Sequence, residues 1–168
     1  RKIFKKPLRS LLPNRLRSRL GLNIKHELTY FSKKRDISQR LRKKYDYEGD
    51  LVQLALKNKN ILVKYDHYFP IYEKYFSKFR GKKVKILEIG VANGGSLECW
   101  RKYFGKDAII YGIDIDHNCL NLNIKEAEIR IGSQVDEAFL KKIVQEMGGN
   151  IDIVIDDGSH VMSHIKKT

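Results

Sequence analysis

The chain has 168 residues, a formal net charge of +14, 42% hydrophobic residues and 32% charged residues. This length is enough for one domain with a sizeable core, and no apolar run approaches the roughly 20 residues of a membrane span. We expect no secretory signal, because the basic start is not followed by an apolar stretch of roughly 7–15 residues. The two cysteines, Cys99 and Cys119, have neither metal-site nor disulfide-framework spacing, so we expect a reducing cytoplasm.

The positive charge is concentrated near the start of the sequence. Residues 1–50 hold 16 Lys or Arg and 5 Asp or Glu, a balance of +11, and residues 51–168 hold 18 and 15, a balance of +3. Within residues 1–20, Pro7 and Pro13 interrupt any long helix. We therefore expect a basic, solvated lead-in over residues 1–35, with a weak contact to an anionic surface through residues 1–20 as the alternative.

A helical region is predicted over residues 36–82. Asp36 can cap a helix that runs through ISQRLRKKY, and a second helix is predicted near Gly49–Lys59. A third helix should start near Pro70, because proline is tolerated in a first helical turn. We expect the third helix to present four apolar residues to the core: Ile71, Tyr72, Tyr75 and Phe76.

Strands and helices then alternate over residues 83–168. Four strands are predicted, at Lys85–Ile89, Ile109–Ile115, Glu128–Ile131 and Ile151–Ile155. The first, second and fourth are nearly continuous in apolar character, which is typical of parallel strands covered on both faces, and the third is expected nearer an edge. The pattern predicts an α/β fold with a Rossmann-like parallel sheet, incomplete at about four strands, and a helical N-terminal extension.

Two helices are predicted between these strands. The first covers Ser96–Phe104, and the second covers Gln134–Met147. Ser133 can cap the second helix, and Gly148 and Gly149 can end it.

The segment from Lys83 to Ile115 carries the main functional pattern. An apolar strand leads into a small-residue turn and a helix, and a second strand ends in an acid, as in the nucleotide-binding half of a Rossmann-like unit. Gly95 and Asp114 are 19 positions apart, close to the roughly 20 expected for an acid that chelates a ribose diol.

The turn also indicates which ligand binds. Gly90, Ala92 and Gly95 stand where a dinucleotide fingerprint requires glycines, and the middle glycine, which lets a pyrophosphate approach, is missing. Glu88 would repel a pyrophosphate but suits a ligand with an ammonium and a sulfonium group, such as S-adenosylmethionine (SAM). A NAD(P)-dependent oxidoreductase and a Glu88 that merely ends a buried strand remain the alternatives.

A second group of polar residues follows the fourth strand. Asp156 and Asp157 come directly after it and are followed by Gly158, Ser159 and His160. Adjacent carboxylates can hold Mg²⁺, which would acidify a substrate hydroxyl, and an imidazole suits proton removal near neutral pH. The alternatives are that Asp156 caps the next helix, that Asp157 is solvated and that His160 is a structural hydrogen-bonding residue. His164 is expected to be solvated or packed.

Four blocks of the sequence, in order, resemble one family. They are YDHYFPIYEKYFSKFRGKKVKILEIG, GGSLECWRKYFG, IRIGSQVDEAFL and IDIVIDDGSH, within about residues 64–164. Together they resemble the class I SAM-dependent methyltransferases, and more narrowly the macrocin- and mycinamicin-type sugar O-methyltransferases and the cephalosporin-hydroxylase-like proteins.

The resemblance implies an O-methyltransferase of natural product biosynthesis that acts on a small-molecule hydroxyl, with a sugar as one candidate. It implies that Asp157 is a metal ligand and that His160 is the general base. The family's other metal ligands are acids beyond the position of Thr168, so we expect a fragment that binds Mg²⁺ weakly and could be inactive. A non-catalytic basic binding module is a further alternative.

The expected cofactor contacts combine the turn, the second acid and the block that begins IRIGSQ. In that block the family often has Asp where this chain has Ser133. The residues expected to bind the cofactor are Glu88, Gly90, Gly94, Gly95, Ser96, Asp114, Ser133 and Gln134.

Overall fold

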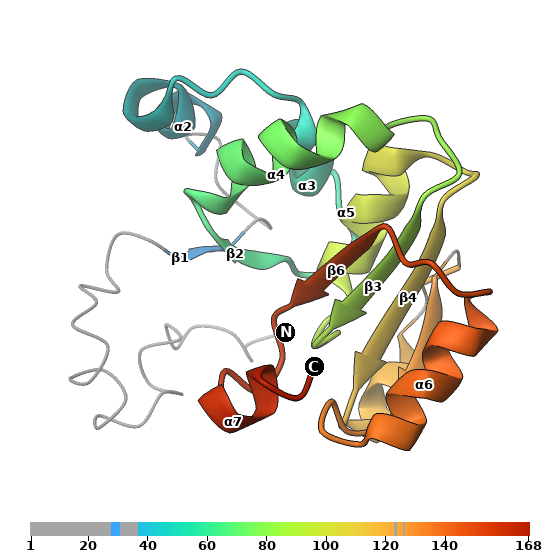
Figure 1. Ribbon diagram of the computed structural model, residues 1–168. Coiled ribbons are helices and arrows are strands. Elements are labelled where there is room, and N and C mark those ends of the chain that lie inside the picture. The colour runs from blue at the N-terminus through green and yellow to red at the C-terminus, as the bar shows by residue number, and fades with distance from the viewer. Residues whose placement is uncertain (1–27, 31–36, 123, 126) are drawn as a thin grey trace, which may run out of the picture.

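The computed structural model describes residues 28–30, 37–122, 124–125 and 127–168 (Figure 1). The predictions for residues 1–27, including the lead-in and its surface contact, and the helix cap at Asp36 lie outside the described residues. Within the described ranges, no helix combines the length and the apolar character that crossing a membrane requires.

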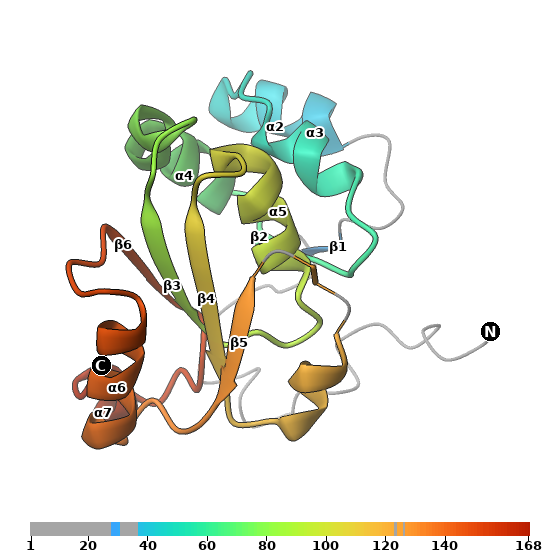
Figure 2. The same cartoon turned by 90° about the vertical axis from the view of Figure 1, so that its right-hand side faces the viewer.

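A parallel sheet forms the centre of the structure. Its strands are β3 (Lys85–Ile89), β4 (Ile109–Asp114), β5 (Glu128–Ile131) and β6 (Ile153–Asp156), and they lie in the order β5-β4-β3-β6 (Figure 2). All three pairings are parallel, so the four carboxyl ends share one edge. The predicted α/β class and Rossmann-like sheet are confirmed, including the position of β5 at an edge.

Helices cover the two faces of this sheet unequally (Figure 1). On one face lie α3 (Leu51–Leu56), α4 (Tyr68–Phe76) and α5 (Gly95–Phe104). On the other face α6 (Glu137–Glu146) packs against β3 and β4 through Ile143. Short helical segments complete the described part: η2 (Ser77–Phe79), η3 (His117–Asn121) and α7 (Met162–Ile165).

The helical region before the sheet shares the core of the α/β part. In α2 (Ile37–Tyr45), Ile37 and Leu41 are fully buried in the same hydrophobic cluster as Leu97 of α5. The predicted domain divisions at residues 35/36 and 82/83 remain predictions. Two three-residue strands, β1 (Leu28–Tyr30) and β2 (Val63–Tyr65), form a separate antiparallel pair that the sequence analysis did not predict.

The buried stripe of α4 differs from the prediction. The helix begins at Tyr68, two residues before Pro70. Phe69 is buried, whereas Ile71 and Tyr75 are 46% and 57% exposed. The reason is helical geometry: positions 69, 72 and 76 form one stripe at i, i+3 and i+7, and positions 71 and 75 lie off it. The prediction that Ile71 and Tyr75 face the core is therefore wrong.

The strand β6 also differs from the prediction. Ile153 and Ile155 are buried, but Val154 is 55% exposed. In the described structure β6 lies at the edge of the sheet opposite β5. Ile153 and Ile155 pack into the cluster on the side of α3, α4 and α5, whereas the cluster on the side of α6 includes residues of β3 and β4 but none of β6. The prediction that this strand is covered on both faces is wrong.

The helix α6 begins three residues later than the sequence analysis predicts. Its N-cap is Asp136, whose Oδ1 accepts a hydrogen bond from the Phe139 amide at 3.1 Å. The Ser133 hydroxyl instead accepts a hydrogen bond from the Val135 amide at 3.3 Å, in the turn before the helix. The predicted cap at Ser133 is therefore wrong, and the predicted end at Gly148 and Gly149 is confirmed.

The position of this cap leads to a stability prediction. We expect Asp136→Ala to lower the free energy of unfolding by about 1 kcal/mol, because the substitution removes the acceptor for a helical amide. Ser133→Ala is the matched control and should cost less, since its hydrogen bond lies outside the helix. Chemical denaturation of the two variants measures the difference. A larger loss for Ser133→Ala would show that the helix starts where the sequence pattern places it.

Candidate functional site

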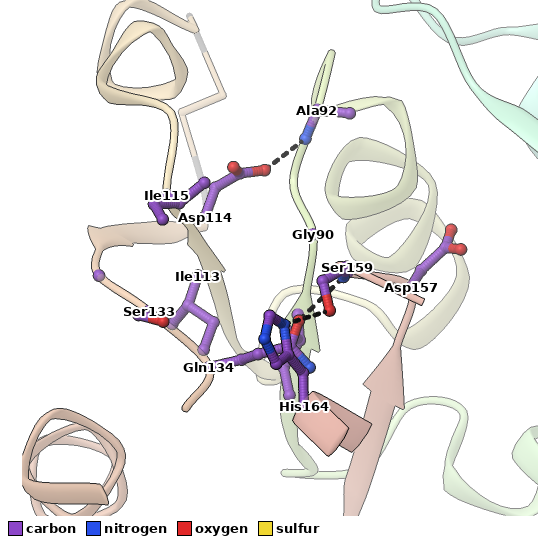
Figure 3. A pocket seen from close by; sticks show the side chains of 13 residues that line it. Gly90, Ala92, Ile113, Asp114, Ile115, Ser133, Gln134, Asp157, Ser159 and His164 are labelled. Atoms are coloured by element: carbon purple, nitrogen blue, oxygen red, sulfur yellow. Dashed lines mark hydrogen bonds between the residues drawn. The ribbon is translucent and has the colours of Figure 1, made fainter. Parts of the chain in front are cut away.

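A cavity with a volume of about 320 Å³ lies at the carboxyl edge of the parallel sheet (Figure 3). This volume is within the range of small-molecule sites, and open parallel sheets bind their ligands at this edge. Its wall contains the carboxyl ends of β3 and β4 and the segments that follow β3, β4, β5 and β6. The lining residues are Ile89, Gly90, Ala92, Ile113, Asp114, Ile115, Gly132, Ser133, Gln134, Asp157, Gly158, Ser159 and His164.

The glycine turn after β3 forms one wall of the cavity. Gly90 has a φ of +93°, and a Cβ at this position would lie 2.3 Å from the Asp157 carbonyl oxygen. Gly94, at the N-cap of α5, has a φ of +74°. Both positions therefore need glycine, the first for space as well as for conformation. Gly94, Gly95 and Ser96 do not line the cavity, so their predicted cofactor contacts stay predictions.

Asp114 connects the end of β4 to this turn. Its Oδ2 accepts hydrogen bonds from the Val91 amide at 2.8 Å and from the Ala92 amide at 3.0 Å, and Figure 3 shows the second of these. Its Oδ1 accepts one from the Asp116 amide at 3.0 Å. Burial raises the pKa of Asp114, but these backbone donors outweigh burial and hold the pKa below its usual value. The carboxylate is therefore ionised at neutral pH and fixes the turn beside the cavity.

Gln134 joins the ends of β5 and β6. Its Oε1 accepts a hydrogen bond from the Ser159 amide at 2.9 Å, and its Nε2 donates to Asp156 Oδ2 at 3.3 Å. Ser133 lies beside it in the cavity wall. The structure thus places Ser133 and Gln134 of the IRIGSQ block in the cavity wall, and their contact with a cofactor stays a prediction.

The two neighbouring acids after β6 have different partners. Asp156 accepts hydrogen bonds from Gln134 and from the Gly158 amide. Asp157 accepts a hydrogen bond from Lys64 through Oδ2, and its Oδ1 lies 3.5 Å from His160 Nε2. The structure therefore does not bring the acids together as a joint metal-binding pair. No group of three or more His, Cys, Asp and Glu in the described part of the chain is placed to hold a metal ion.

The two histidines near the site lie in different places. His160 is exposed, has a φ of +54° and precedes α7, with its ring beside Asp157. His164 lines the cavity, and its Nδ1 lies 2.9 Å from the Ser159 hydroxyl (Figure 3). The sequence analysis missed His164 as a cavity residue, because its spacing from His160 gave no sign of which side of α7 faces the cavity.

Glu88, which we expected to contact the cofactor, lies in the core and not in the cavity wall. It is 0% exposed. Its Oε1 accepts a hydrogen bond from Lys64 Nζ at 3.0 Å, and its Oε2 accepts one from Trp100 Nε1 at 2.9 Å. Glu88 does not line the cavity, so its position does not support a direct contact with a cofactor.

Lys64 is a buried residue of the site region that sequence reasoning missed. It lies on β2 and contacts both Glu88 and Asp157. Burial lowers the pKa of Lys64, but the two carboxylates outweigh burial and raise it. Lys64 is therefore a buried cation. A single lysine in a three-residue strand carries no motif, so no local signal could have identified it.

The chain is similar to known proteins in sequence and in fold. No protein-family model matches the sequence. Over 126 residues the chain is 38% identical to the 8-demethyl-8-(2-methoxy-alpha-L-rhamnosyl)-tetracenomycin-C 3'-O-methyltransferase of Streptomyces olivaceus, with 69% of this chain and 31% of the relative covered. Over 110 residues it is 39% identical to the mycinamicin VI 2''-O-methyltransferase of Micromonospora griseorubida, with 60% and 26% covered.

A solved structure has the same fold. It is the MycE methyltransferase of the mycinamycin biosynthetic pathway, in complex with Mg, SAH and mycinamycin VI. The TM-score is 0.54 and the sequence identity is 34%, with 71% of this chain and 31% of that chain covered. The chain thus spans about a third or less of the length of these proteins. In sequence and in fold it is similar to the sugar O-methyltransferases of the mycinamicin and macrocin type, and the resemblance that its motifs indicate is confirmed.

Proposed function

We propose that the protein containing this chain is a SAM-dependent O-methyltransferase of natural product biosynthesis, and that its methyl acceptor is a sugar hydroxyl. The main observation is the cavity at the carboxyl edge of the sheet, where the glycine turn, Asp114 and Gln134 meet. The names of the relatives support the reaction class, since each is an O-methyltransferase and one names a rhamnosyl substrate. MycE was solved with SAH and Mg, which supports the cofactors.

The chemistry of the cavity fits this cofactor. SAM supplies a methyl group that its sulfonium makes electrophilic. Asp114 and Asp157 lie beside the cavity, where a carboxylate suits a cationic ligand. Asp114 Oδ1, which accepts one amide, can accept a further hydrogen bond from a ribose hydroxyl. Ile115 lines the cavity and is 73% exposed, so it offers an apolar surface to an adenine ring.

The proposed reaction is an in-line methyl transfer. His160 lies beside Asp157 and outside the cavity lining, and we assign to it the proton of an acceptor hydroxyl bound on that side. The hydroxyl oxygen forms a bond to the methyl carbon while the carbon–sulfur bond breaks. The products are a methyl ether and S-adenosylhomocysteine. Asp157 Oδ1, 3.5 Å from His160 Nε2, stabilises the imidazolium, and the exposed ring then releases its proton to solvent.

Asp157 is also the residue that would hold Mg²⁺. Its position fits a weak site, because Mg²⁺ is often held by one or two carboxylates and keeps several waters. The ion would lower the pKa of the acceptor hydroxyl. Asp156 is turned to Gln134 and Gly158, so we assign the metal contact to Asp157 alone.

The other sequence expectations have less support. The dinucleotide-binding alternative lacks its middle glycine at Ala92, and the comparisons give no support to a non-catalytic binding module. Cys99 and Cys119 are free thiols, which supports the proposal of a reducing, cytoplasmic compartment.

The first test concerns the cofactor. We expect Asp114→Ala to weaken binding of S-adenosylhomocysteine by roughly 10- to 100-fold, because charge-assisted hydrogen bonds contribute roughly 1.5–3 kcal/mol. Asp116→Ala is the matched control, since this acid caps η3 and does not line the cavity. Calorimetry on the intact protein measures both affinities. Equal affinity of wild type and Asp114→Ala would contradict the assignment.

The second test concerns the metal. We expect Asp157→Asn to weaken Mg²⁺ binding by about tenfold or more, because a neutral amide is a poorer ligand for a hard cation. Asp156→Asn is the matched control and should change the affinity much less. A Mg²⁺ titration of the intact protein in the presence of S-adenosylhomocysteine compares them. If Asp156→Asn has the larger effect, Asp157 is not the ligand.

A further inference from the structure

Lys64 is a cation in a position where lysine is rarely found. It is 3% exposed, and lysine is almost never fully buried unless it is paired. Its ammonium group binds two carboxylates, that of Glu88 at 3.0 Å and that of Asp157. Burial raises the pKa of Glu88, and the contacts with Lys64 and Trp100 oppose that rise. In their ionised forms the three groups carry one positive and two negative charges.

Only one of these partners reaches the candidate site. Glu88 is held on the core side, because its second oxygen accepts a hydrogen bond from Trp100 Nε1. Asp157 lines the cavity, and its side chain is 33% exposed. Figure 3 shows the Asp157 carboxylate at the side of the cavity away from Asp114. Lys64 therefore connects Asp157, at the cavity wall, to Glu88, which is buried in the core.

The two oxygens of Asp157 are used differently. Oδ2 accepts the hydrogen bond from Lys64, and Oδ1 faces His160 Nε2 at 3.5 Å. An aspartate at a cavity rim would otherwise sample several rotamers, and fixing it in advance removes that entropy cost from the bound state. The anchor at Oδ2 decides which way Oδ1 points.

From this geometry we infer that Lys64 is a positioning residue for the proposed methyl transfer: it holds Asp157 so that Oδ1 is presented to His160 and to a bound cation. The inference rests on the proposed function. Stability alone does not account for the lysine, because replacing a buried ion pair by apolar residues of similar size is often neutral or stabilising. The positioning role explains why a cation lies between the core and the cavity.

The test needs variants that leave no carboxylate in the core without its cation. Lys64→Met alone would leave two carboxylates without their cation, so we choose the double variant Lys64→Met/Glu88→Gln. In it the net charge of the three positions stays at one negative charge, and a side-chain oxygen at position 88 still accepts from Trp100. The reference is Glu88→Gln, which alters the same core position but keeps Lys64 beside Asp157.

Three quantities are measured on the intact protein: calorimetric affinity for S-adenosylhomocysteine, Mg²⁺ affinity and kcat. Relative to the wild type, whose net charge at the three positions it keeps, and to Glu88→Gln, we expect the double variant to lose about 10- to 100-fold in Mg²⁺ affinity and kcat, the usual effect of removing a residue that orients a ligand. Affinity for S-adenosylhomocysteine should change by less than about twofold, because Lys64 does not line that cavity. A merely structural role would lower all three quantities together.

The outcomes separate the inference from the proposed function. If the double variant equals Glu88→Gln in Mg²⁺ affinity and in kcat, the inference is overturned while the proposed function stands. If the wild-type protein does not bind S-adenosylhomocysteine, the proposed function is overturned and the inference with it. Should the double variant not fold, Lys64→Leu/Glu88→Gln, which likewise leaves Asp157 Oδ2 without its donor, carries the same expectation.

Discussion

The candidate site depends on the parallel register that places β3 between β4 and β6. The hydrogen bonds of the sheet continue past the strand ends, from the Gly90 amide to Ile113 at 2.8 Å and from the Asp157 amide to Ile89 at 2.9 Å. They bring the turn, the end of β4 and the loop after β6 to one edge. Because a Cβ at Gly90 would meet the Asp157 carbonyl oxygen, the backbones can only approach this closely through glycine.

Two acids at this edge are held in place by different groups. Backbone amides of the turn bind Asp114, and the side chain of Lys64 binds Asp157. The binding partners of each acid suit the role that we propose for it. Amides hold Asp114 as part of a rigid wall, whereas the lysine fixes one oxygen of Asp157 and leaves the other for chemistry. The two acids therefore divide the cavity into a proposed cofactor side and a proposed acceptor side.

Local patterns were enough to predict most of the sheet. The bounds of β3 and β5 match the prediction, and β4 ends one residue earlier. These bounds can be predicted because an apolar run and the glycine turn that ends it consist of neighbouring residues in the sequence. Long-range pairing could not be predicted in this way. Lys64 is 24 residues from Glu88 and 93 from Asp157, so nothing near Glu88 shows that its charge is neutralised in the core. The directions of Asp156, Asp157 and His164 depend on the same tertiary contacts. At α6, Ser133 and Asp136 are both good caps, and the extended backbone at Asp136 decides between them.

The most direct test of the central claim is a crystal structure of the intact protein with S-adenosylhomocysteine. The account predicts the ribose diol within hydrogen-bonding distance of Asp114 and the adenine ring against Ile115. It also predicts that Glu88 keeps its contacts with Lys64 and Trp100 and does not touch the ligand. A ligand bound away from the carboxyl edge of the sheet, or one whose ribose makes no contact with Asp114, would contradict the account.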